Sequence, residues 1–91
     1  MHDRIRKHMT IYGDVQGVGF RYRAEHAANS LRLTGWVRNE WDGSVEMEVQ
    51  GEEESIKKLL SMIGQGTYVF IERVVEEVIP LEEEERSFRV R

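Results

Sequence analysis

The chain has 91 residues, enough for one small domain with one hydrophobic core, so we expect residues 1–91 to form a single domain. Charged residues make up 33% of it, and the formal net charge of −4 at pH 7 argues against a nucleic-acid partner, which would require basic residues to neutralise its phosphates. The sequence has no cysteine for a disulfide or a thiol nucleophile, no apolar stretch of the roughly 20 residues that span a bilayer and no secretory signal, so we expect a cytoplasmic protein that does not enter membranes.

The first part of the chain alternates between the period of a strand and the period of a helix. Residues 5–13 predict a strand, and residues 14–19 predict a tight loop with glycines at 17 and 19. Residues 20–31 predict a helix, because one helical face carries Ala24, Ala27, Ala28 and Leu31. Residues 33–39 alternate again and predict a second strand.

The second part repeats this arrangement. Asp42-Gly43 indicates a hairpin that leads into a strand over residues 44–50. Acidic residues 52–54 open a second helix, which ends near Gly64 and has an apolar stripe of Ile56, Leu59, Leu60 and Ile63. Residues 68–79 predict a long strand, residues 82–85 an exposed turn, and residues 87–91 a short last strand.

This order is typical of the α+β, ferredoxin-like βαββαβ fold with an added fifth strand. In that fold two helices cover one face of an antiparallel sheet. The fold is shared by RNA binders, metabolite sensors and enzymes, so it does not decide the function.

The glycine loop before the first helix is the segment that suggests chemistry. The first N–H groups of a helix have no internal partner and favour an anion, and glycines let a loop turn its N–H groups into one concavity. Arg21 lies in the first turn of the helix, where its guanidinium can bind two oxygens of one phosphoryl group. A dinucleotide fingerprint is excluded because Tyr22 occupies the place of its third glycine, and no Gly-Lys-Ser/Thr triplet of a Walker loop is present.

Asn39 is expected at the same pocket. Successive elements of this fold alternate in direction, so the end of the second strand lies beside the glycine loop. If no bulge interrupts the alternation, Asn39 shares the helix-covered face with Val37. Arg21 would then neutralise the phosphoryl oxygens while Asn39 orients a water for in-line attack.

Three motifs carry a family resemblance: GDVQGVGFR at residues 13–21, GWVRN at residues 35–39 and DGSVE at residues 42–46. With this spacing the chain closely resembles the acylphosphatase family over its whole length. The resemblance implies a five-stranded antiparallel sheet backed by two helices. It also implies hydrolysis of a small acyl phosphate to a carboxylate and inorganic phosphate, with no metal, no cofactor and no general base.

The resemblance also assigns roles to residues. It implies that Arg21 binds the phosphate and that Asn39 orients the water. The phosphate cradle would consist of the backbone amides of Gln16, Gly17, Val18, Gly19 and Phe20. Tyr22 and Arg23 flank this site, and the three histidines have no metal-site spacing. No extended apolar interface is indicated, so we expect a monomer.

The sequence departs from the family pattern at three places. Asp14 stands where a basic residue is common and would weaken anion attraction unless its side chain points to solvent. Arg32 replaces the glycine expected after the first helix, which predicts strain of about 1 kcal/mol in a left-handed backbone. The loop at 64–68 lacks a common proline, which bears on substrate preference.

Two alternatives stay open at this stage. One is a non-catalytic acylphosphatase-like module that binds a phosphorylated or carbamoylated ligand. The other is RNA binding on the open sheet face, which requires exposed aromatic residues in a basic field. Glu46 and Glu48 on a central strand argue against the RNA binder.

Overall fold

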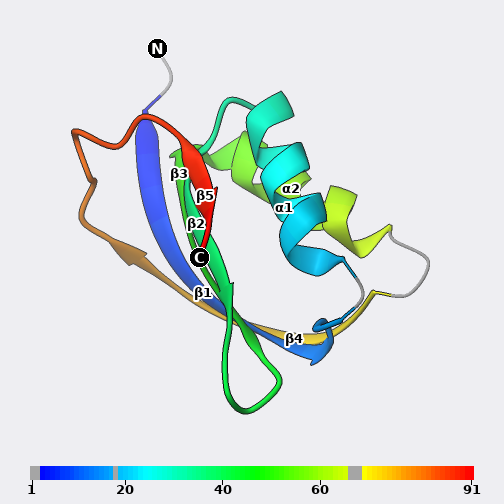
Figure 1. The fold of residues 1–91 in the computed structure, drawn as a ribbon. Coiled ribbons are helices and arrows are strands. Elements are labelled where there is room, and N and C mark those ends of the chain that lie inside the picture. Colours follow the sequence, from blue (N-terminus) through cyan, green and yellow to red (C-terminus); the bar gives the residue numbers. More distant parts are fainter. Residues whose placement is uncertain (1–2, 18, 66–68) are drawn as a thin grey trace.

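The computed structural model describes residues 3–17, 19–65 and 69–91, which form the predicted succession of elements (Figure 1). They are β1 (Arg4–Asp14), α1 (Phe20–Ser30), β2 (Thr34–Asn39), β3 (Val45–Glu52), α2 (Glu53–Gly64), β4 (Phe70–Ile79) and β5 (Phe88–Val90). Both helices cover one face of the sheet. Within the described ranges, neither helix is long and apolar enough to cross a membrane.

The sheet has the strand order β4-β1-β3-β2-β5 and is mixed, so the expectation of a purely antiparallel sheet is wrong for one pair. Strands β1 and β2 run in the same direction because both pair antiparallel with β3. A strand that reverses after β4 also runs in this direction. Since β1 already has β3 and β4 as neighbours, β5 adds to the free edge of β2 and pairs with it in parallel.

The core lies between the sheet and the helices and follows the predicted faces. From the strands it receives Met9, Ile11, Val37, Val45, Met47 and Val49, all fully buried. From the helices it receives Phe20, Ala24, Ala28, Ile56, Leu59 and Ile63. Helix α1 contributes mainly alanines, and these small side chains let its backbone approach the strands that carry the pocket described below.

The open face of the sheet contains a buried arginine. Arg6 is 2% exposed, and its guanidinium donates to Glu48 Oε1 at 3.0 Å and to both carboxylate oxygens of Glu85 at 2.7 and 3.2 Å. Burial opposes the charge on Arg6, but the hydrogen bonds with Glu85 and Glu48 outweigh burial and raise the pKa of the guanidinium. The prediction of an exposed turn at 82–85 is therefore wrong for Glu85, which folds back over the sheet.

Arg32 has the left-handed backbone that the sequence predicted, with φ at 60°. It is the one non-glycine residue with positive φ in the described part of the chain. The chain reverses here because the Leu33 N–H donates to the Ala28 carbonyl at 2.9 Å, beyond the end of α1. A Cβ in this conformation contacts its own backbone, and this stores strain at the end of the helix.

Replacing Arg32 with glycine should raise the free energy of unfolding by about 1 kcal/mol, because it removes that Cβ contact. Urea denaturation of the wild type and Arg32→Gly measures the difference. Arg32→Ala is the control, since it removes the charge and keeps the Cβ. Equal stabilities of the glycine and alanine variants would show that the backbone at this position is not strained.

Candidate active site

Two glycines of the segment between β1 and α1 have the left-handed backbone that an anion cradle requires. Val15 is fully buried and anchors it in the core, while Gly17 and Gly19 have φ of 71° and 80°. A Cβ at either glycine would meet no atom within 4 Å, so glycine is required there by the backbone conformation and not by lack of space. Gly19 is the N-cap of α1 and forms no side-chain cap, which leaves the first helical N–H groups for a ligand.

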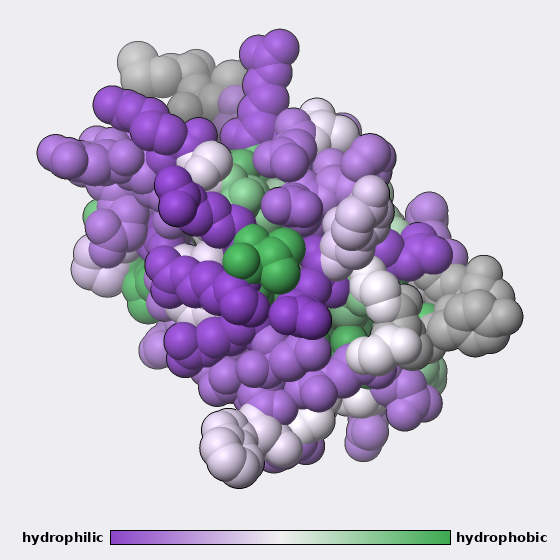
Figure 2. All heavy atoms as spheres, in the orientation of Figure 1, coloured by the Kyte–Doolittle hydropathy of each residue, from purple (hydrophilic) through white to green (hydrophobic). Residues whose placement is uncertain are grey.

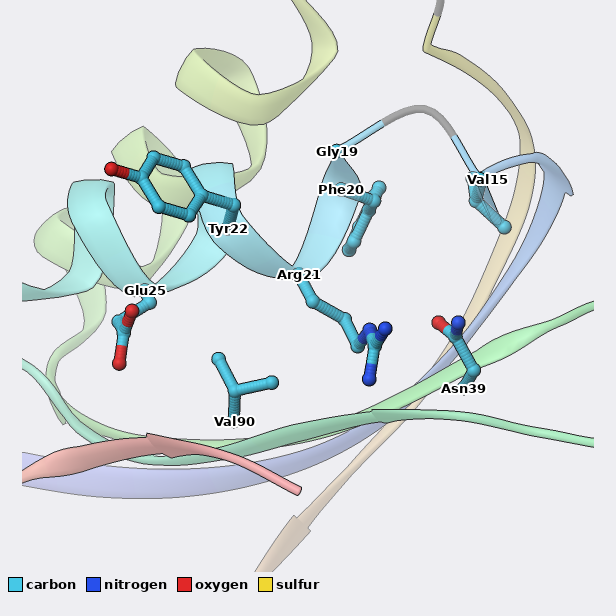
Figure 3. A pocket seen from close by; sticks show the side chains of 9 residues that line it. Val15, Gly19, Phe20, Arg21, Tyr22, Glu25, Asn39 and Val90 are labelled. Carbon is cyan, nitrogen blue, oxygen red and sulfur yellow. The ribbon is translucent and has the colours of Figure 1, made fainter.

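A cavity of about 420 Å³ opens beside this loop (Figure 3). Its lining consists of Val15, Gly17, Gly19, Phe20, Arg21, Tyr22, Glu25, Asn39 and Val90. It thus brings together Arg21 from α1 and Asn39 from the end of β2, as the topology predicted. The condition for Asn39 is met, because β2 pairs with β3 without a register shift from Thr34 to Asn39.

The Asn39 side chain offers an acceptor at the wall of this cavity. Its Oδ1 is buried and has no hydrogen-bond partner, and it is the one such side-chain atom among the described residues. A buried acceptor without a partner is costly, which favours a ligand or water that donates to it. Asn39 is therefore suited to hold a water molecule through Oδ1.

Arg21 lies on the opposite wall and points toward Asn39 (Figure 3). Its Nη1 donates to the main-chain oxygen of Arg91 at 3.4 Å, a long contact that lies beyond the usual range for N–H···O bonds. The other N–H groups of the exposed guanidinium have no partner among the described residues. The fork is thus available to bind an anion at the loop.

The Gln16 side chain connects the loop to the β2–β3 hairpin. Its Nε2 donates to the carbonyl oxygens of Glu40 and Ser44, both at 2.7 Å. The hairpin is closed in turn by Asp42 Oδ1, which accepts from the Ser44 N–H at 3.0 Å and from its Oγ at 2.6 Å, and these bonds lower the pKa of Asp42. The sequence predicted a role for the Gln16 backbone amide only, because nothing local indicates that the two carbonyls are near.

Of the other predicted cradle residues, Gly17, Gly19 and Phe20 line the cavity, whereas Val18 lies outside the described residues. Asp14 is exposed and does not line it. The predicted 64–68 loop lies mostly outside the described ranges. Among the residues that are described, no group of three histidine or acidic side chains is placed to hold a metal ion.

Outside the glycine-loop motif, sequence reasoning missed two cavity residues, Glu25 and Val90. For Glu25 a signal existed, because it follows Arg21 by four residues and so lies on the same face of α1. For Val90 no local signal existed, since its position depends on the pairing of β5 with β2.

The acylphosphatase family model matches residues 7–90. An acylphosphatase from Geobacillus kaustophilus is 44% identical over 86 residues, which cover 93% of this chain and 92% of the relative. The chain belongs to the acylphosphatase family. Its fold is similar to an acylphosphatase structure from Coxiella burnetii, with 38% identity, a TM-score of 0.87 and coverage of 98% of this chain and 94% of that one. An acylphosphatase crystal structure from Bacillus subtilis, at 28% identity, has a TM-score of 0.85 with coverage of 94% and 97%.

Removing the two hydrogen bonds that Gln16 Nε2 donates should disturb the cavity beside the glycine loop. Gln16→Leu keeps the volume and leaves the carbonyls of Glu40 and Ser44 without their donor, which should lower the free energy of unfolding by roughly 2 kcal/mol. It should also weaken the binding of inorganic phosphate. Urea denaturation and phosphate titration measure the two effects.

Ser44→Ala is the matched control. It removes the Oγ bond to Asp42 within the hairpin and keeps the carbonyl that accepts from Gln16. Phosphate affinity should stay unchanged in this variant. If both variants weaken phosphate binding equally, the hairpin as a whole, and not its bond to Gln16, determines the shape of the loop.

Proposed function

We propose that this protein is an acylphosphatase that hydrolyses acyl phosphates to a carboxylate and inorganic phosphate without a metal or a cofactor. The observation that carries the proposal is the meeting of Arg21 and the partnerless Asn39 Oδ1 at one cavity beside the glycine loop. Family membership supplies the reaction class.

In the proposed complex the phosphoryl group sits at the N-terminus of α1. The backbone amides of residues 16–20 donate to its oxygens, and the Arg21 guanidinium binds two of them. These donors are aimed at the position where charge develops during phosphoryl transfer. Because Gly17 and Gly19 already have the left-handed backbone that such a loop needs, less of the binding energy is needed to order it.

Asn39 positions the nucleophile. A water donates one hydrogen bond to Asn39 Oδ1 and attacks phosphorus in line with the leaving carboxylate oxygen. The bond from the water oxygen to phosphorus forms as the bond from phosphorus to the acyl oxygen breaks. The water proton passes to a phosphoryl oxygen, and the acyl group leaves with the bond electrons as a carboxylate, so no side chain has to act as a base.

The surface supports a monomer without a nucleic-acid partner. The edge strand β4 carries Glu72 and Glu77, whose like charges oppose pairing with a second copy. Figure 2 shows a face on which polar and charged residues dominate and apolar residues form small separate patches. Trp36 on the open face is 7% exposed because Arg38 and Arg91 cover its ring, so it offers no platform for a base. We place this enzyme in the cytoplasm.

The first prediction from this mechanism concerns Arg21. Purified wild-type protein should hydrolyse benzoyl phosphate in excess chelator, and Arg21→Gln should lose most turnover and bind phosphate more weakly, because the cavity loses its one arginine. Arg23→Gln on the same helix is the control and should keep both properties, since Arg23 does not line this cavity. Absence of turnover in the wild type, with phosphate still bound, would indicate a non-catalytic binding module.

The second prediction concerns Asn39. Asn39→Ala should lower kcat by roughly 100- to 1,000-fold, the usual effect of removing one group that acts on the transition state, while the inhibition constant of phosphate stays nearly unchanged. Steady-state kinetics with phosphate as competitive inhibitor separates the two quantities. Asn29→Ala, at an exposed position of α1, is the control. A raised KM with unchanged kcat would contradict the water-positioning role.

A further inference from the structure

The cavity has a second end, away from the phosphate cradle. Figure 3 shows Asn39 on one side of the Arg21 side chain and both Glu25 and Val90 on the other side. Glu25 follows Arg21 by one helical turn, which places its Cα about 6 Å further along α1, away from the glycine loop. One cavity therefore joins a cationic end at the cradle to an end that carries a carboxylate.

The Glu25 carboxylate is unusual in this position. It is only half exposed, and it forms no hydrogen bond and no ion pair with any described residue, Arg21 included. A carboxylate in a cavity that binds anions repels them at short range, and partial burial strengthens this repulsion. Nothing else in the described part of the chain gives this side chain a structural task.

The geometry of the reaction assigns the second end to the acyl group. In an in-line displacement the attacking and leaving oxygens lie on opposite sides of phosphorus. If the water is held at Asn39, the acyl group leaves in the direction away from Asn39, toward Glu25 and Val90. This assignment rests on the function proposed above.

We propose that Glu25, Val90 and Tyr22 form an acyl subsite that selects acyl phosphates whose acyl group carries a positive charge beyond an apolar part. Val90 and Tyr22 provide apolar surface, being 40% and 74% exposed. Beyond them the carboxylate of Glu25 attracts an ammonium group and repels a second carboxylate. The substrate class is a cationic acyl phosphate, for example one derived from an amino acid whose amino group lies distant from the reacting carbonyl.

Three substrates of similar shape test the proposal: benzoyl phosphate, its 4-aminomethyl derivative and its 4-carboxy derivative. For the wild type, kcat/KM should be about tenfold higher for the cationic than for the anionic derivative, as expected from one partly exposed ion pair and one like-charge contact. Added salt should reduce this ratio. Glu25→Gln should bring this ratio close to the ratio of the non-enzymatic hydrolysis rates of the two derivatives. Glu25→Lys should make the anionic derivative the better substrate.

Glu77→Gln is the matched control, because it removes one negative charge from β4, at a position opposite His8 on the far face of the sheet. Its ratio should equal that of the wild type, which separates a local contact from the effect of net charge. The proposal of an acyl subsite is wrong if the ratio of kcat/KM for the cationic to the anionic derivative is the same in the wild type, Glu25→Gln and Glu25→Lys. The acylphosphatase function would still stand, because all three substrates are hydrolysed. Absence of hydrolysis of every substrate by the wild type would instead overturn the function itself.

Discussion

The cavity depends on one side chain that spans two parts of the chain. Gln16 leaves the β1–α1 loop and uses both of its amide hydrogens on the β2–β3 hairpin, at the carbonyls of Glu40 and Ser44. The loop carries the proposed phosphate cradle, and Asn39 stands directly before the hairpin. The two hydrogen bonds therefore fix the distance between the groups proposed to bind the anion and the group proposed to hold the water. A shorter polar residue would not reach both carbonyls, and a glutamate would present no donor to either.

A second constraint acts from the opposite face of the sheet. Arg6 is buried there with Glu48 and Glu85, and such an ion pair contributes little net stability because the loss of hydration offsets the attraction. The ion pair instead determines the position of the chain before β5. It holds Glu85 over the sheet, so that β5 begins close to the edge of β2. The Arg91 N–H then bonds the Val37 carbonyl at 2.8 Å, which places Val90 at the cavity wall. The far face thus helps to place Val90 at the end of the cavity where we propose that the acyl group binds.

The parts of the fold and site that follow local rules could be predicted from the sequence. The positions of Arg21 and Asn39 follow from the start of a helix and from strand alternation, both of which depend on a few neighbouring residues. The parallel pairing of β5 could not be predicted in this way, since it is decided by which sheet edges are already occupied. The contact of Arg6 with Glu85 joins residues 79 positions apart, and no pattern in either segment indicates it. The bonds of Gln16 were missed for the same reason.

The direction of charge movement during the reaction explains why the carboxylate at the acyl end matters. As the bond from phosphorus to the acyl oxygen breaks in the proposed reaction, negative charge moves from the phosphoryl group, which Arg21 and the amides are proposed to stabilise, toward the acyl oxygen. For a neutral acyl group Glu25 opposes this movement, so it raises the barrier. A positive charge on the acyl group that pairs with Glu25 offsets the repulsion in the transition state, where it is largest. The selectivity should therefore appear in kcat as well as in KM, which separates a transition-state effect from simple capture of a cation.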